Sequence, residues 1–258
     1  MRIYLMLALL AMGSSIFAEE KPTPFSTPTS KIPNAVKNTV KRFFGEEAAK
    51  TVAPAPIKGL YEVVVGGEDV LYISRNGRYI VAGNLFEAET RKNLTEERRA
   101  QLRKAQKPAR MKAINAVDEK EMVVFAPEGE VKHTINVFTD VDCGFCAKFH
   151  KEVPKLTQAG IKVRYLAFPR AGVDSATYKK MVSVWCASDR QQAMTDAKAR
   201  LDIKQVTCKN PVKAQLGLGQ EIGITGTPAM VFSDGELVPG YVKATKLIPW
   251  LDEKFPSN

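Results

Sequence analysis

Two cysteines three positions apart form the part of this sequence best suited to chemistry. Cys143 and Cys146 enclose a glycine and a phenylalanine, after a β-like run over residues 134–138 and before a helix-like run over residues 147–158. A Cys-x-x-Cys pair between a strand and the start of a helix is typical of a redox-active dithiol. The helix dipole and free backbone N–H groups stabilise a thiolate on the first cysteine. We therefore expect Cys143 to be the nucleophile and Cys146 the resolving thiol.

The same two thiols would also fit half of a zinc site or a plain structural disulfide. A second motif favours redox chemistry, because Thr227 and Pro228 stand directly before an apolar run at residues 229–232. A bond that precedes proline is the place where a cis peptide can occur in a folded chain. Most Thr-Pro pairs are ordinary trans turns, so this motif is informative only together with the dithiol upstream of it.

The first residues of the chain predict export. Arg2 is followed by an apolar stretch over residues 3–12 and by small residues that suit cleavage after Ala18. These are the parts of a secretory signal peptide, and the apolar stretch is too short to span a bilayer. A retained anchor helix is the alternative. We expect a signal peptide at residues 1–18 and a disordered segment, rich in Pro, Ser and Thr, at residues 19–29.

The other two of the four cysteines are Cys186 and Cys208. Disulfides persist in exported proteins, so we expect these two to form a structural disulfide. A loop of this length contributes roughly 3 kcal/mol in the chain-entropy model. One zinc site built from all four thiols is the alternative, but structural zinc sites usually join two closely spaced pairs. A c-type haem would need histidine where Ala147 stands, so we expect no metal and no other cofactor.

Length and charge set further limits. About 240 of the 258 residues would remain after export, which is enough for two domains. The formal net charge is +10 and the pI is about 9.4, a balance that could suit nucleic acid. The surplus positive charge gathers in residues 91–112, which contain no aromatic side chain on which a base could stack. A solvated helix is therefore favoured over a nucleic-acid surface.

The predicted N-terminal unit is small. Its elements are a helix at residues 30–44 that ends at Gly45, and strands at residues 60–65, 70–74 and 78–82. Asn76 and Gly77 predict a type I′ hairpin turn. A unit of about 55 residues buries little apolar surface by itself. Its open sheet edge is a template for an identical edge, so we expect a homodimer.

A polar helix is predicted to follow, from the N-cap Asn93 to about Lys107, with Pro108 at its end. It has few apolar residues, so we expect a semi-rigid spacer between two bodies. From about Ala113 the pattern becomes mixed α/β. The predicted strands lie at residues 122–125, 133–139, 160–167, 229–233 and 236–239, and the helices at residues 147–158, 175–186, 190–199, 211–220 and 245–255, the last interrupted at Pro249.

With these elements in place, nearly all of the mature chain resembles the DsbC/DsbG family of periplasmic disulfide isomerases. The resemblance rests on residues 137–140 leading into the dithiol, residues 163–170, residues 185–187, and residues 226–229 with 237–241. It implies an α+β, cystatin-like dimerisation domain at residues 30–87, a helical linker at residues 88–112, and an α/β thioredoxin-like catalytic domain with a helical insertion at residues 113–258. It further implies a V-shaped homodimer whose catalytic domains face each other across an uncharged cleft.

The resemblance also implies an activity. Such proteins rearrange wrong disulfides in misfolded exported proteins, hold unfolded chains as chaperones, and are kept reduced by a membrane reductase of the DsbD type. In thioredoxin-like folds the proline of the second motif lies against the dithiol, so Thr227 and Pro228 would bind the substrate chain. The chain departs from the family at Phe145, where tyrosine is usual.

Three other functions remain open. A DsbG-like reductase of oxidised cysteines shares the architecture, a monomeric oxidase of the DsbA type shares the dithiol, and a periplasmic holdase would use only the cleft. Among nearby residues, we expect His150 to have no redox role, although a protonated imidazole would favour a thiolate. Asp140 and Asp142 are interpreted as strand-end and helix-cap groups, with proton transfer as the alternative.

Overall fold

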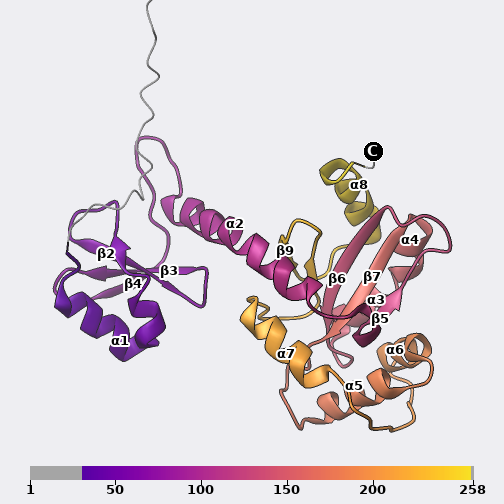
Figure 1. The fold of residues 1–258 in the computed structure, drawn as a ribbon. Helices are drawn as coiled ribbons and strands as arrows, with labels where there is room; N and C mark the ends of the chain where they lie inside the picture. Colours follow the sequence, from indigo (N-terminus) through magenta and orange to yellow (C-terminus); the bar gives the residue numbers. More distant parts are fainter. Residues whose placement is uncertain (1–30, 257–258) are drawn as a thin grey trace, which may run out of the picture. The chain divides into compact units, whose positions relative to one another are not determined.

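The computed structural model describes residues 31–256. The predicted signal peptide, its cleavage site after Ala18 and the segment at residues 19–29 lie outside the described residues. The chain divides into two compact units (Figure 1). One unit comprises the described residues up to Val63 and residues 71–82, and the other comprises residues 64–70 and the chain from Gly83 onward. Among the described helices, none has the length and apolar character needed to cross a lipid bilayer.

The N-terminal region combines one helix with a four-stranded sheet of order β1-β2-β3-β4. Its elements are α1 (Asn34–Ala49), β1 (Ala53–Pro54), β2 (Leu60–Val65), β3 (Asp69–Ser74) and β4 (Ile80–Ala82). Val36 and Val40 lie four residues apart on α1 and are fully buried, as expected for the apolar face of an amphipathic helix. The sequence missed β1, which is only two residues long and contains a proline.

The sequence predicts that helix α1 ends at Gly45, but the helix continues beyond this residue. Gly45 has φ 88° and ψ 176°, and the helix resumes after it and continues to Ala49. Glycine adopts such positive φ values without the steric cost that a Cβ imposes. Burial of Ala48 shows that the resumed turn packs on the rest of the unit. The glycine is therefore a break within the helix.

The turn between β3 and β4 also differs from the prediction. Gly77 has φ +70°, but Asn76 does not have a positive φ, and a type I′ turn requires both. The N–H of Gly77 donates to the carbonyl of Ser74 at 2.8 Å. A Cβ on Gly77 would lie 2.6 Å from the carbonyl oxygen of Ala35 in α1. Glycine is needed here both for its backbone conformation and for the close approach of the helix.

The polar helix α2 (Leu94–Asn115) begins as predicted, because the side chain of Asn93 accepts a hydrogen bond from the N–H of Glu96 at 3.0 Å. It does not end at Pro108, which lies inside the helix. Proline removes one backbone hydrogen bond at that point. The helix nevertheless runs on for seven more residues to Asn115.

Packing explains why α2 passes through the proline. Arg110 is 4% exposed and Ile114 is 1% exposed, so one face of this half of the helix packs into the second unit. The guanidinium of Arg110 donates to the carbonyl of Ile222 at 3.1 Å and to the carbonyl of Gly235 at 2.8 Å. The C-terminal half of α2 is thus part of the second body rather than a free spacer.

The sheet of the second unit has the order β5-β7-β6-β8-β9. Its strands are β5 (Val123–Phe125), β6 (His133–Thr139), β7 (Ile161–Ala167), β8 (Ala229–Val231) and β9 (Leu237–Pro239). The central strand β6 runs parallel to β7 and antiparallel to β8, and the two edge pairs are antiparallel. Val137 of β6 pairs with Tyr165 of β7 within one apolar cluster, while Phe138 and Leu166 belong to a second. Successive residues of a strand point to opposite faces, so both faces of this sheet are covered.

Six helices and a short 3-10 turn complete the second unit. They are η1 (Glu119–Glu121), α3 (Gly144–His150), α4 (Val153–Gln158), α5 (Ala176–Cys186), α6 (Arg190–Lys198), α7 (Val212–Glu221) and α8 (Ala244–Lys254). Two predictions need correction here. The helix predicted at residues 147–158 is divided into α3 and α4, and α8 continues through Pro249 instead of being interrupted there. Helices α5 to α7 lie between β7 and β8 in the chain and form the predicted helical insertion (Figure 1).

Candidate active site

Cys143 lies between the end of β6 and the start of α3. It is the N-cap residue of α3, and its sulfur accepts a hydrogen bond from the N–H of Cys146 at 3.4 Å. Both thiols are free, and both are buried, with exposures of 3% for Cys143 and 0% for Cys146. The sulfur lies at the positive end of the helix dipole and accepts a hydrogen bond from a backbone N–H. Both interactions stabilise a thiolate.

The proline motif lies directly beside this sulfur. The Thr227–Pro228 peptide bond is cis. The Sγ of Cys143 lies 3.3 Å from the carbonyl oxygen of Thr227, to which the thiol donates. The fold thus brings together two motifs that are far apart in the sequence.

The surroundings push the pKa values of the two thiols in opposite directions. Burial opposes ionisation of Cys143, but interactions with Thr227, with Cys146 and with the guanidinium of Arg170 outweigh it and lower the pKa of this thiol. Burial dominates at Cys146 and raises the pKa there, although the charge of Lys198 acts in the other direction. Dithiol exchange needs one thiol with a lowered pKa and a second thiol with a raised pKa.

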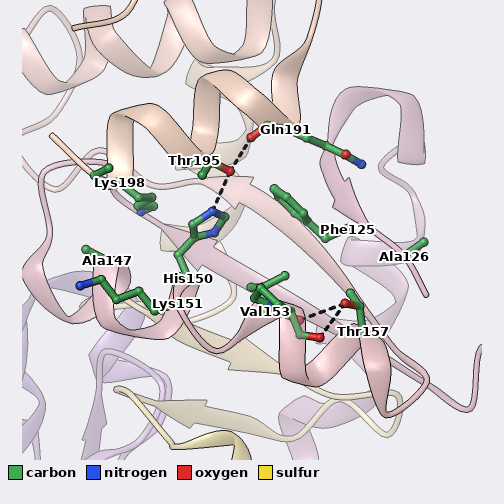
Figure 2. A pocket seen from close by; sticks show the side chains of 12 residues that line it. Phe125, Ala126, Ala147, His150, Lys151, Val153, Thr157, Gln191, Thr195 and Lys198 are labelled. Carbon is green, nitrogen blue, oxygen red and sulfur yellow. Dashed lines mark hydrogen bonds between the residues drawn. The ribbon is translucent and has the colours of Figure 1, made fainter. Parts of the chain in front are cut away.

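His150 is held as a neutral group. Its Nδ1 lies 3.1 Å from the hydroxyl of Tyr165 and its Nε2 lies 3.1 Å from the hydroxyl of Thr195, the latter contact shown in Figure 2. Burial, and then the charge of Lys198, lower the pKa of His150 to about 4. An uncharged imidazole at neutral pH cannot supply the positive charge that would favour a thiolate.

Asp140 and Asp142 fix the loop before the dithiol. One oxygen of Asp140 accepts from the N–H of Asp142 at 2.8 Å, and the other accepts from Nε of Arg170 at 3.1 Å. Asp142 pairs with Lys180 at 2.8 Å. Burial raises the pKa of Asp142, but hydrogen bonds from Lys180 and Thr177 outweigh it and the pKa is lowered. Neither carboxylate caps α3, because Cys143 is itself the N-cap residue.

Two groups near the dithiol were missed in the sequence. Arg170 lies in a stretch that resembles the family but carries no motif of its own, and its charge acts on Cys143. Lys198 stands on a polar helix, and its Nζ donates to Thr139 Oγ1 at 2.6 Å and to the carbonyl of Asp140 at 2.7 Å. Nothing in the local sequence marks Lys198 as buried, since the pattern around it is that of a solvated helix.

The second pair of cysteines is joined. The Cys186–Cys208 disulfide has an S–S distance of 2.06 Å and a Cα–Cα distance of 5.7 Å. These two sulfurs are therefore not available to a zinc site made from all four thiols. Helix α6 lies within the loop that this disulfide closes.

Comparison with known proteins points to one family for both units. Residues 26–96 match the model described as the disulfide bond isomerase protein N-terminal domain, and residues 119–255 match that of a thioredoxin-like domain. The two-part fold class predicted from the sequence is thereby confirmed.

Individual relatives cover most of the chain. The thiol:disulfide interchange protein DsbC of Escherichia coli (strain K12) is 37% identical over 202 residues, which cover 78% of this chain and 80% of that protein. DsbC of Dickeya dadantii (strain 3937) is 36% identical over 220 residues, covering 84% and 86% respectively. A crystal structure of a disulfide interchange protein from Neisseria gonorrhoeae has 28% identity and a TM-score of 0.48, covering 55% of this chain and 100% of that one. With both domains matched and a free dithiol at the start of α3, the chain belongs to the DsbC family of thiol:disulfide interchange proteins and is a thiol–disulfide oxidoreductase.

Proposed function

We propose that this protein rearranges wrong disulfides in misfolded exported proteins, with Cys143 as the nucleophile and Cys146 as the resolving thiol. The observation that carries the proposal is the position of the Cys143 sulfur, at the N-terminus of α3 and 3.3 Å from the carbonyl oxygen of Thr227. We infer that a substrate chain binds to the backbone of Thr227 and so comes next to this sulfur.

The reaction begins when the Cys143 thiolate attacks one sulfur of a substrate disulfide. That disulfide breaks, one substrate sulfur leaves as a thiolate, and the other becomes joined to Cys143 as a mixed disulfide. A different substrate thiolate can then attack the joined sulfur and release Cys143, which is isomerisation. Alternatively Cys146 attacks Cys143 and releases a reduced substrate, leaving the enzyme oxidised. A membrane reductase of the DsbD type would restore the dithiol in the second case.

Thr227 and Pro228 are the proposed substrate-binding residues. The carbonyl oxygen of Thr227 lies 3.3 Å from the Sγ of Cys143. An extended substrate segment could pair with this backbone in the manner of an added β-strand. Such pairing uses backbone groups and does not depend on the side chains of the substrate, which suits an enzyme that acts on many different chains.

The proposed organisation follows the family. Residues 30–87 form the dimerisation domain, a linker at residues 88–112 leads into the catalytic domain from residue 113, and two chains form a periplasmic homodimer. Support comes from the family match of residues 26–96 and from the small size of the N-terminal sheet. Helix α2 reaches Asn115 and is buried at Ile114, so the helix of the linker continues into the catalytic domain.

A chaperone activity is proposed in addition. Phe145, between the two cysteines, is 59% exposed. An exposed aromatic side chain next to the reactive sulfur offers apolar surface to an unfolded substrate. Holding a chain and exchanging its disulfides would therefore use the same surface.

Refolding of a scrambled, multiply disulfide-bonded protein tests the proposal. The wild-type protein should restore native activity of that substrate in a redox buffer, and Cys143→Ser should lose this while still suppressing aggregation of a cysteine-free chain. Aggregation suppression without any disulfide rearrangement by the wild type would favour the holdase. Alkylation trapping in cells should find the dithiol reduced; an oxidised dithiol would favour an oxidase of the DsbA type.

A further inference from the structure

The side chain of Lys198 is both charged and buried, which is rare for a lysine in a folded protein. Lys198 is the last residue of α6, it is 5% exposed, and within the described residues it forms no ion pair with a carboxylate. Burial of a charge without a paired counter-charge is costly. Its hydrogen bonds go instead to Thr139 Oγ1 at 2.6 Å and to the carbonyl of Asp140 at 2.7 Å.

Those two partners are also the neighbours of the resolving thiol. The side chain of Thr139 and the backbone of Asp140 both interact with Cys146. Because Lys198 donates to Thr139 Oγ1, that oxygen is occupied as an acceptor and its own proton is free to point toward the sulfur. Lys198 therefore binds two residues, Thr139 and Asp140, that also lower the pKa of Cys146.

Helix α6 holds this side chain against the rear of the dithiol helix. Figure 2 shows Lys198 and Thr195 of α6 together with His150 of α3, lining one pocket. The pocket has a volume of about 410 Å³ and is open on one side, so water can enter beside the buried groups.

We propose that Lys198 is a positioning residue for the resolving step, because its ammonium group stabilises the Cys146 thiolate through Thr139 and by its own charge. The proposal rests on the assignment of Cys146 as the resolving thiol. It concerns how long a mixed disulfide lasts, which decides between rearrangement and reduction of the substrate.

The step that Lys198 assists is balanced within the protein and its substrate. Cys146 gives up its proton, and the resulting thiolate attacks the sulfur of Cys143 in the mixed disulfide. The bond between Cys143 and the substrate breaks, the substrate sulfur leaves with the electron pair and takes up a proton, and a Cys143–Cys146 disulfide forms. The dithiol is oxidised and the substrate is reduced.

Other charged or titratable groups near this site act less strongly on the pKa of Cys146 than Lys198 does. They are Cys143, Asp140, Asp142, His150, Tyr165 and Arg170. His150 is neutral because burial and Lys198 hold its pKa at about 4, and burial keeps Tyr165 protonated by raising its pKa. Arg170 is bound to the carboxylate of Asp140. Burial raises the pKa of Cys146, and among the groups that oppose this Lys198 is the foremost.

Thiolate absorbance in the Cys143→Ser background tests the first half of the proposal, since Cys146 is then the free thiol of the dithiol site. Lys198→Met should raise the pKa of Cys146 in a titration of the ultraviolet thiolate signal. Lys151→Met is the matched control, because Lys151 lines the same pocket but is exposed. The control should leave the titration unchanged.

The lifetime of the mixed disulfide tests the second half. With both cysteines present, Lys198→Met should lengthen it about three- to fourfold for each unit by which the pKa of Cys146 rises, because the thiolate fraction falls about tenfold while the nucleophilicity of the thiolate rises about threefold. Equal titrations and equal lifetimes in wild type and Lys198→Met would overturn the proposal. Failure of the wild type to form any mixed disulfide would instead overturn the proposed function. If Lys198→Met does not fold, Thr139→Val decides, since it keeps the lysine and removes the hydroxyl; an unchanged titration in that variant also overturns the proposal.

Discussion

The two cysteine pairs of the second unit have opposite chemistry within one folded body. Cys143 and Cys146 are free thiols at the start of a helix, whereas Cys186 and Cys208 are joined across a sequence separation of 22 residues. The first pair has a cis-proline loop beside it and a buried lysine behind it. Cysteine chemistry in this protein is therefore set by the elements around each sulfur, since all four cysteines share the same chain and compartment.

Removing each thiol of the first pair in turn is the most direct test of this difference between the two cysteine pairs. Cys143→Ser should reduce mixed-disulfide formation to background, because it removes the low-pKa sulfur at the helix N-terminus. Cys146→Ser should instead accumulate mixed disulfides, because the attacking thiol of the resolving step is gone. Non-reducing electrophoresis with a substrate protein measures both. Trapping that depends on Cys146 alone would reverse the assignment.

The second pair should matter for stability rather than for exchange. Replacing both Cys186 and Cys208 by alanine should lower the free energy of unfolding by roughly 2–4 kcal/mol, because the unfolded chain is no longer cross-linked. Denaturant unfolding measures this. The matched control is the double alanine variant of Cys143 and Cys146, which should lose exchange but little stability. Equal losses of stability in the two double variants would remove the distinction drawn here.

Lys198 gives a smaller and pH-dependent effect on stability. Burial lowers its pKa in the folded protein to about 8, from an ordinary value of 10.5. Below pH 8 both states hold the proton and the folded state bears the cost of the buried charge, and this cost disappears as the pH rises toward 10.5. Lys198→Met should therefore raise the free energy of unfolding at pH 7 by on the order of 1 kcal/mol. The gain should shrink in unfolding curves between pH 8 and 10; a gain that is constant with pH would count against a buried charge.

Arg170 should have the smallest effect. Its charge helps to lower the pKa of Cys143, but its side chain is 48% exposed, so water and salt screen it. Arg170→Gln should slow alkylation of Cys143 only a few-fold near neutral pH, because it lowers the thiolate fraction modestly. The difference from wild type should decrease with added salt. Rates measured in the Cys146→Ser background would isolate the first thiol.

Short-range patterns made much of the second unit predictable. The dithiol and the proline motif are each a few residues long. The strands β6 and β7 carry apolar residues whose local pattern predicts a buried strand. The full length of α2 was not predictable, because the contacts of Arg110 with two carbonyls across the fold outweigh the proline inside the helix. Lys198 was missed for the same reason. Its burial depends on how α6 lies against α3, and its own helix has the pattern of a solvated one.

The loop that Cys186 and Cys208 close has a consequence for how each new copy of the protein is made. This loop contains α6 and with it Lys198, which lies behind the dithiol. A newly synthesised chain holds four thiols, and a single disulfide among them can form in six ways. Only the pairing of Cys186 with Cys208 leaves both Cys143 and Cys146 free. Under the proposed function, the protein has to be oxidised at one pair and left reduced at the other before it can work, so a new copy is itself a substrate for the copies made before it.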